Sequence, residues 1–376
     1  MNIEIKEVTN RRMLRQFINF ANKLYKYSPY YCPPLFLDEL NTFNRRMNPA
    51  LKICDCVCYL AYSEGKIVGR VCGIINHCAN QKWQNNRVRF GWFDFIDNME
   101  VSHALLNAVA EWGRQHGMTE LNGPLGFTDF DHEGLLIEGY DYDSPMASLY
   151  NYPYYVRHLE AYGLRKEVDW IEYRIFIPDR VPEKMERVAK IAMERYHLRI
   201  DKVHSAKELV RRYGYTFFDV IDLAYQPLYN FQPLTAEQKR YYTKMYMPML
   251  NYDFVTIVVN EVDEIVGVGV GMPNISSALR ACNGRLFPFG WWHLLRMLRS
   301  KRMHAFDLLL IAVRPDYQNK GVNSLFFYDQ TKYFVQYGVH HSETTSILET
   351  NIKNQANWSY FERAQHKRRR AYCKKI

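Results

Sequence analysis

A polar turn between a strand and a helix carries the residues of this chain that are best suited to bind an anion. The turn spans residues 314–320, it follows an apolar run at 306–313, and Gly321 closes it. Apolar residues then recur at helical spacing, so the pattern predicts a strand, a turn and a helix in that order. A helix that begins at a glycine directs unpaired backbone N–H groups and its positive end at one place, which suits a phosphate group.

This turn resembles the cofactor-binding motif of the GNAT acyltransferases, Val-x-Pro-x-Tyr-Arg/Gln-x-x-Gly-x-Gly/Ala. Five positions match and the last one differs: Val313, Pro315, Tyr317, Gln318, Gly321 and, in the last place, Asn323. The resemblance implies that the loop amides hold the pyrophosphate of acetyl-CoA or another acyl-CoA, and that the preceding strand receives the pantetheine arm. The cofactor-binding residues that it implies are Ile311, Val313, Gln318, Asn319, Lys320, Gly321, Val322 and Asn323.

Acyl transfer to an amine needs a base for the amine proton and an acid for the leaving thiolate. The resemblance implies that the acid is a tyrosine on the helix after the fifth strand, and Tyr360 is the candidate. Glu349, at the end of the preceding strand, is the candidate base. The alternatives are a tyrosine that packs against the sheet and a carboxylate that helps to cap the helix. No standard ligand spacing occurs, so no metal site is predicted.

The elements that position these residues occur twice along the chain. Residues 60–75 and 257–272 both read as strand, acidic turn and strand, with Ile-Val-Gly at the same place. A strand, a polar turn, a helix and a glycine follow in each half. We therefore predict an α/β protein of two tandem GNAT-like domains, residues 1–178 and 179–376, and the resemblance implies a mixed twisted β-sheet flanked by helices in each.

The first of these domains differs at the cofactor turn. Its turn is Asp97-Asn98-Met99-Glu100, which contains neither a glycine nor a basic residue. Two carboxylates at a helix start occupy its positive end and would repel a pyrophosphate. We therefore expect the N-terminal domain to bind no coenzyme A and the C-terminal domain to carry the activity.

The composition and net charge of the chain indicate which classes of partner it can bind. The chain has 376 residues, 48% of them hydrophobic, and a net charge of +9, which favours anionic partners such as coenzyme A, an acidic carrier protein or acidic lipid. The eight cysteines show no zinc-ligand spacing and are expected to be free, mostly buried thiols. The N-terminus has no apolar signal segment, so a cytoplasmic enzyme is expected. The basic C-terminal tail alternates like a strand and has no reader motif, so we do not expect nucleic-acid binding.

Two longer segments also carry side chains that could bind a ligand or a partner. The loop at 123–143 carries Asp129, Asp131, His132, Glu133 and Glu138, which predicts a substrate-recognition loop or a solvated acidic loop. The insertion Ala278–Met303 carries four aromatic residues and six basic ones: Phe287, Phe289, Trp291, Trp292, Arg280, Arg285, Arg296, Arg299, Lys301 and Arg302. Peripheral membrane contact, a lid over an acyl chain and a helix packed on its own core are the alternatives.

The resemblance implies an N-acyltransferase that moves an acetyl or longer acyl group from acyl-CoA to an unidentified small-molecule amine or amino acid. One alternative is an enzyme similar to long-chain N-acyl amino acid synthases, which take the acyl group from an acyl carrier protein. A second alternative, of a different class, is a non-catalytic protein that binds a ligand or partner on a retained GNAT fold.

Overall fold

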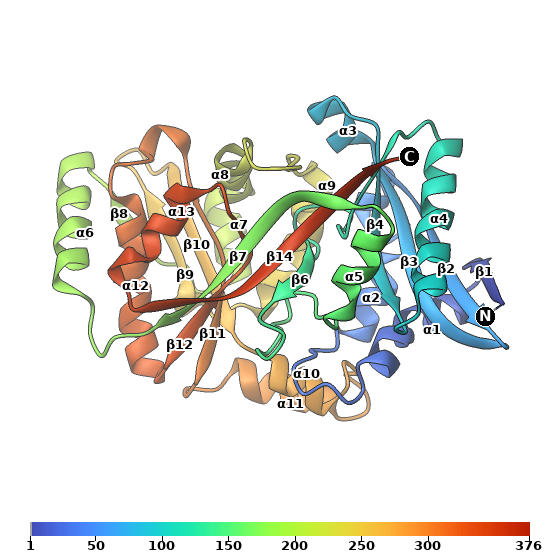
Figure 1. Ribbon diagram of the computed structural model, residues 1–376. Coiled ribbons are helices and arrows are strands. Elements are labelled where there is room, and N and C mark those ends of the chain that lie inside the picture. Colours follow the sequence, from blue (N-terminus) through green and yellow to red (C-terminus); the bar gives the residue numbers. More distant parts are fainter. Residues whose placement is uncertain (1) are drawn as a thin grey trace. The chain divides into compact units, whose positions relative to one another are not determined.

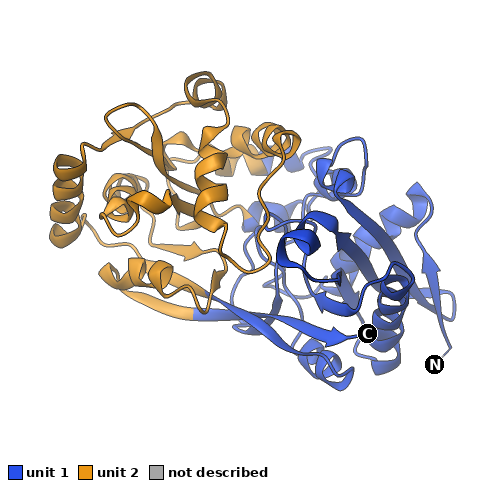
Figure 2. Ribbon diagram, turned by 90° about the horizontal axis from the view of Figure 1, so that it is seen from above, with its two compact units in different colours: residues 1–171, 276–293, 366–376 blue, residues 172–275, 294–365 orange. Residues whose placement is uncertain are grey.

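The computed structural model describes residues 2–376, and the chain divides into two units (Figure 2). Unit 1 contains the chain up to Ile171 together with Ser276–His293 and His366–Ile376. Unit 2 contains Glu172–Ile275 and Leu294–Gln365. This division lies close to the predicted boundary after residue 178, but two later segments return to unit 1.

Unit 1 is built on a mixed sheet in the strand order β1-β2-β3-β4-β5-β14-β7. Neighbouring strands from β1 to β4 are antiparallel, β4 and β5 are parallel, and β5 and β14 are antiparallel. The strands are β1 Ile3–Glu7, β2 Cys54–Ser63, β3 Lys66–Asn76, β4 Arg87–Phe95, β5 Glu120–Gly123, β6 Leu135–Glu138, the first part of β7 Arg165–Phe176 and most of β14 Arg363–Lys375. The helices are α1 Arg11–Leu24, α2 Phe36–Thr42, α3 His77–Trp83, α4 Met99–Gln115, α5 Tyr154–Ala161, α10 Ser276–Ala281 and the start of α11 Gly290–Leu298.

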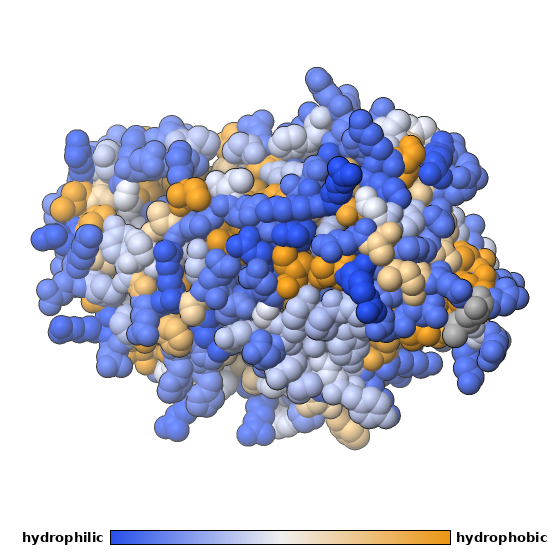
Figure 3. All heavy atoms as spheres, viewed as in Figure 1, coloured by the Kyte–Doolittle hydropathy of each residue, from blue (hydrophilic) through white to orange (hydrophobic). Residues whose placement is uncertain are grey.

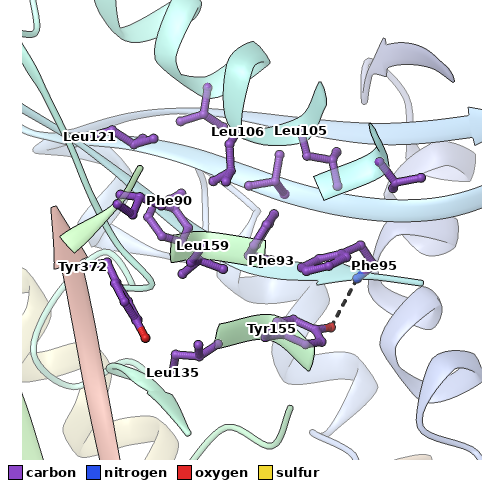
Figure 4. Close-up of a cluster of buried hydrophobic side chains, with 14 of the residues drawn as sticks. Phe90, Phe93, Phe95, Leu105, Leu106, Leu121, Leu135, Tyr155, Leu159 and Tyr372 are labelled. Atoms are coloured by element: carbon purple, nitrogen blue, oxygen red, sulfur yellow. Dashed lines mark hydrogen bonds between the residues drawn. The ribbon is translucent and has the colours of Figure 1, made fainter. Parts of the chain in front are cut away.

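The core of unit 1 lies between this sheet and α4, which runs along β2, β3 and β4 (Figure 1). The apolar residues of α4 recur at helical spacing, so one face of the helix, with Leu105 and Leu106, is fully buried. Figure 4 shows how Phe90, Phe95 and Tyr155 gather beneath them. The Tyr155 hydroxyl accepts a hydrogen bond from the backbone N–H of Phe95 at 3.2 Å, so a buried polar atom is paired.

Unit 2 repeats the arrangement, with the strand order β7-β12-β11-β10-β9-β8. Its strands are the last part of β7, then β8 Arg199–Asp201, β9 Val255–Val259, β10 Ile265–Pro273, β11 Ala305–Val313, β12 His341–Thr344 and β13 Ile347–Leu348. Its helices are α6 Glu183–Tyr196, α7 Ala206–Tyr213, α8 Thr216–Tyr225, α9 Ala236–Tyr246, the end of α11, α12 Val322–Tyr337 and α13 Ile352–Asn357. The strand, turn and helix predicted around Gly321 are β11, a short 3-10 turn and α12.

Each unit is completed by a strand from the other half of the sequence. The basic C-terminal strand was predicted to finish the second domain, but β14 pairs with β5 of unit 1, with Tyr372 opposite Gly123. In unit 2 the end of β7 pairs with β12, and the Arg174 guanidinium donates to Glu343 at 2.6 and 3.0 Å. The alternation of residues in the tail predicted a strand, but alternation carries no information about which strand it pairs with.

The segment Ser276–His293 contacts the N-terminal part of the chain within unit 1. The backbone N–H of Phe36 donates to the Gly284 carbonyl at 2.9 Å, and Arg280 forms an ion pair with Asp143 at 3.0 Å. These contacts explain why this part of the insertion belongs to unit 1. All eight cysteines are free thiols, as expected.

Candidate functional site

The parallel pairing of β11 with β12 ends halfway along β11. It runs from Ala305 opposite His341 to Leu308 opposite Thr344, where β12 ends, while β11 continues to Val313. The N–H of Thr345 still donates to the Leu308 carbonyl at 3.1 Å. The distal part of β11, residues 309–313, therefore extends beyond its pairing with β12.

A β-bulge lies where this pairing ends. On the other side of β11, Val270 of β10 is opposite Leu310 and Gly271 is opposite Leu308, so Leu309 has no partner residue in the register. A bulge of this kind turns the backbone and increases the local twist, which separates strands. The side chains of Leu309, Leu310 and Ile311 are only half-buried although they belong to a central strand. The bulge and the exposure together mark this part of β11 as a surface able to receive a ligand.

Two residues of the turn after β11 have a left-handed backbone conformation. Asn319 and Gly321 both lie in the left-handed region, with φ of 62° and 77°. Gly321 is the N-cap of α12 and supplies no side-chain cap. Its carbonyl accepts the N–H of Ser324 at 3.0 Å, so an anion at this helix start would bind the N–H groups that precede Ser324. The predicted role of the turn in binding a pyrophosphate remains a prediction, and its geometry agrees with that role.

Asn323, the residue that departs from the motif, has a structural partner. Its side-chain amide donates to Asn357 at the end of α13 at 2.8 Å. The hydroxyl of the next residue, Ser324, donates to the Gly321 carbonyl at 2.6 Å. The side chain at the last motif position therefore points toward α13, and it connects the start of α12 to the segment that carries Tyr360.

Cationic side chains lie on both sides of the turn. The Arg314 guanidinium donates to Asp316 at 2.8 and 2.9 Å, and the resulting hydrogen bonds lower the pKa of that carboxyl. The Lys320 ammonium lies over the ring of Tyr317 at 4.7 Å and over that of Tyr196 at 5.3 Å. Arg314 is thus held by a carboxylate, whereas Lys320 is the cation placed beside Gly321.

The two candidate catalytic residues lie at opposite ends of α13. Glu349 precedes the helix, and Tyr360 follows it in a 3-10 turn, although the resemblance implied a position on the helix itself. The Tyr360 ring is 38% exposed and lies 5.3 Å from the Lys184 ammonium of α6. A six-residue helix is about 9 Å long, so these two groups would serve different protons.

The equivalent helix start in unit 1 is closed by its own side chains. The Asn98 side chain caps α4 by accepting from the N–H groups of Glu100 and Val101 at 2.9 and 3.2 Å. Asp97 accepts from His158 and Arg157, both at 2.8 Å, and the hydrogen bond from His158 is the main cause that lowers its pKa. An anion would meet a capped helix and a carboxylate here, which supports the expectation for this domain.

The distal part of the fourth strand in unit 1 is covered by its own chain. Beyond the last parallel pair of β4 with β5, the Leu125 N–H donates to the Phe90 carbonyl at 2.9 Å. A Cβ on Gly91 would lie only 2.4 Å from the Leu125 carbonyl oxygen, so the two backbones are in close contact. Leu125 and Phe127 are buried, and the pKa of Asp131 is raised by its burial. The alternative of a solvated acidic loop is therefore wrong for this stretch, which packs against β4, whereas substrate recognition stays a prediction. In unit 2 the Ile311 carbonyl at the corresponding part of β11 accepts a hydrogen bond from the Tyr225 hydroxyl of α8 at 3.2 Å.

Several features of the site had no clear signal in the sequence. The bulge at Leu309, the role of Thr345 at the end of the pairing and the Asn323–Asn357 contact depend on strand register and helix packing. Among residues 2–376, no three His, Cys, Asp or Glu side chains are grouped so that they could hold a metal ion.

Two curated proteins are similar to the chain in sequence, and no family model matches it. Protein YghO of Escherichia coli is 27% identical over 382 residues, which cover 99% of this chain and 95% of that protein. The bacterial ceramide synthase of Caulobacter vibrioides is 26% identical over 310 residues, which cover 81% of this chain and 79% of that protein.

Solved structures show the same fold at low sequence identity. A tandem GNAT protein from the clavulanic acid biosynthesis pathway aligns with 100% of this chain and 98% of its own, with a TM-score of 0.55 and 12% identity. A GCN5-related N-acetyltransferase from Sphaerobacter thermophilus covers 99% of this chain and 95% of its own, with a TM-score of 0.53 and 11% identity. The prediction of a tandem GNAT fold is therefore confirmed.

Proposed function

Because the chain has the fold of tandem GNAT proteins, we propose that it is an acyl-CoA-dependent N-acyltransferase whose cofactor binds unit 2. One observation carries the proposal: a single strand, turn and helix combine the bulge at Leu309 with the left-handed turn at Asn319 and Gly321. The pyrophosphate binds the N–H groups at the start of α12. The pantetheine arm runs along the distal part of β11, where Ile311 and Val313 lie.

The reaction is the attack of an amine nitrogen on the thioester carbon. The C–N bond forms and the C–S bond breaks, the base takes a proton from the amine, and the acid protonates the departing thiolate. We assign the first role to Glu349 and the second to Tyr360. Their positions on either side of α13 suit two separate proton transfers, and the Asn323–Asn357 contact connects this helix to the cofactor turn.

The acceptor that we propose is a lipid amine, and the donor carries a long acyl chain. The support is the similarity to a protein named bacterial ceramide synthase, because ceramides are N-acylated lipid amines. An acyl carrier protein is a second donor to test, since the net charge of +9 favours an acidic partner.

The test is a thiol-release assay on the full chain with acetyl-CoA and a long-chain acyl-CoA, each with a sphingoid amine, a free amino acid or no acceptor. We expect thiol release that depends on the lipid amine and decreases in Glu349→Gln and Tyr360→Phe. Coenzyme A binding without turnover with any acceptor would favour the non-catalytic alternative. The absence of coenzyme A binding in calorimetry would refute the proposal.

A further inference from the structure

Four large aromatic side chains are exposed in one short stretch that leads into α11. Phe287 and Phe289 are each 74% exposed, Trp292 is 57% exposed and Trp291 is 43% exposed. Each such ring offers roughly 150–250 Å² of surface, and a soluble protein rarely leaves this much apolar area uncovered. On the face seen in Figure 3, hydrophobic residues occur in small separate groups among hydrophilic ones.

Packing of α11 on its own core does not account for these rings. The helix packs through Gly290 and Leu294, which are buried, whereas the four aromatic side chains lie outside that contact. The outer face of the same helix carries Trp292 and Arg296, and both are exposed. Arg299 directly follows the helix and is also exposed, and its N–H donates to the Leu295 carbonyl at 3.0 Å, so it continues the helical spacing at position i+7 from Trp292. Aromatic and cationic side chains therefore share one face of α11.

Further cationic groups follow directly at the end of this helix. Arg299 and Lys301 line an open pocket of unit 2 together with His204, Asp253 and Tyr337. Tyr337 ends α12, whereas the cofactor turn precedes α12. The pocket is thus at the opposite end of α12 from the proposed pyrophosphate site.

We propose that residues 285–302 form a docking surface for an anionic lipid bilayer. Trp and Phe rings insert at the boundary between headgroups and acyl chains, and Arg and Lys side chains bind the acidic headgroups. The segment lies on the bilayer and does not cross it, because no helix within residues 2–376 is both long and apolar enough to span one. This inference is independent of the proposed acyl transfer.

The charge of the segment argues against a second copy of the chain as the occupant. A symmetric contact through α11 would bring Arg296 and Arg299 toward the same cations of the partner copy, and like charges in contact are unfavourable. An anionic lipid surface supplies the opposite charge together with an apolar layer for the rings.

The test is co-sedimentation of the full chain with vesicles of phosphatidylcholine alone and of phosphatidylcholine mixed with phosphatidylglycerol. We expect binding to the anionic vesicles that weakens as salt is added. Phe287→Ser with Phe289→Ser should lower the partition at least tenfold. Arg296→Glu with Arg299→Glu should lower it roughly 30-fold or more, since each cation contributes about a fivefold factor at such a surface.

Matched controls remove exposed groups of the same type elsewhere. Tyr27→Ser removes a ring that is 86% exposed, and Lys66→Glu with Lys207→Glu reverses two exposed charges. These controls should bind vesicles like the natural chain. Every variant should keep its melting temperature, because the altered side chains are exposed.

Three results would overturn the inference. The natural chain could fail to bind anionic vesicles, or the segment variants could bind them as well as the controls do. Light scattering could also show dimers of the natural chain that Phe287→Ser with Phe289→Ser abolishes. Coenzyme A binding, measured without vesicles, tests the proposed function separately. A failure of the membrane proposal can therefore be told apart from a failure of the proposed acyl transfer.

Discussion

The substitution of Gly321 by Asn or by Asp tests the cofactor turn most sharply. The two side chains have nearly the same shape, and both enter the left-handed conformation more readily than most residues. A Cβ at this position would lie 3.3 Å from Ala192 and 3.3 Å from Val188 of α6, so both variants meet the same neighbours. The difference between them isolates the added negative charge.

The expected magnitude follows from the backbone angle and from Coulomb's law. The φ of 77° costs a non-glycine residue roughly 1 kcal/mol of folding stability, and this cost is shared by both variants. A carboxylate about 5 Å from one phosphate charge is repelled by about 0.8 kcal/mol in water and by about 3.3 kcal/mol at an effective dielectric constant near 20. The Asp variant should thus bind coenzyme A at least about 4-fold and up to about 250-fold more weakly than the Asn variant.

The assay is isothermal titration calorimetry of the natural chain and both variants with coenzyme A, with pantetheine as the ligand that lacks the pyrophosphate. Thermal unfolding with and without ligand provides an independent measure, since a ligand that binds the native state raises the melting temperature with its concentration. The affinity for pantetheine should differ little between the Asn and Asp variants, because pantetheine has no pyrophosphate for the added charge to repel.

Equal affinities of the two variants for coenzyme A would refute the reasoning. If the natural chain and both variants bound equally, the pyrophosphate would lie away from the start of α12. If the Asp variant lost as much affinity for pantetheine as for coenzyme A, the effect would come from a disturbed fold and not from charge.

Three further results are expected. Calorimetry should give one coenzyme A per chain, because the α4 start of unit 1 is capped and faces a carboxylate, and a stoichiometry of two would contradict this. Asp169→Asn should destabilise the chain by about 1.5–3 kcal/mol in urea unfolding, since it removes the carboxylate charge that accepts two hydrogen bonds from the partly exposed Arg370 guanidinium. Burial raises the pKa of Asp169, but hydrogen bonds from Arg370 and other cations lower it overall. The stabilising contribution of Asp169 is therefore present above about pH 4 and lost as pH falls below that value, and Asp169→Asn should flatten this acid dependence. Gly91→Ala should cost about 1–3 kcal/mol because its Cβ would collide with the Leu125 carbonyl, and a melting temperature equal to that of the natural chain would show that this backbone contact is absent.

The sequence by itself determined the repeat, the element types and the place of the strand, turn and helix around Gly321. Strand and helix periodicities are local, and the glycine at 321 is a local requirement for positive φ, so these features can be read along the chain. The same holds for the contrast between the two helix starts, because the Asn98 side chain caps its helix through bonds to Glu100 and Val101, which follow it directly in the sequence.

Only the tertiary structure decided which segments complete each unit and how the distal parts of β4 and β11 are covered. The pairing of β14 with β5 joins Tyr372 to Gly123 across most of the chain, and no residue pattern encodes such a partner. The bulge at Leu309 depends on the register of β10, and the covering of β4 depends on the contact of Leu125 with Phe90. Register and long-range packing arise from the sum of many weak contacts, so the sequence specifies them only through the whole fold.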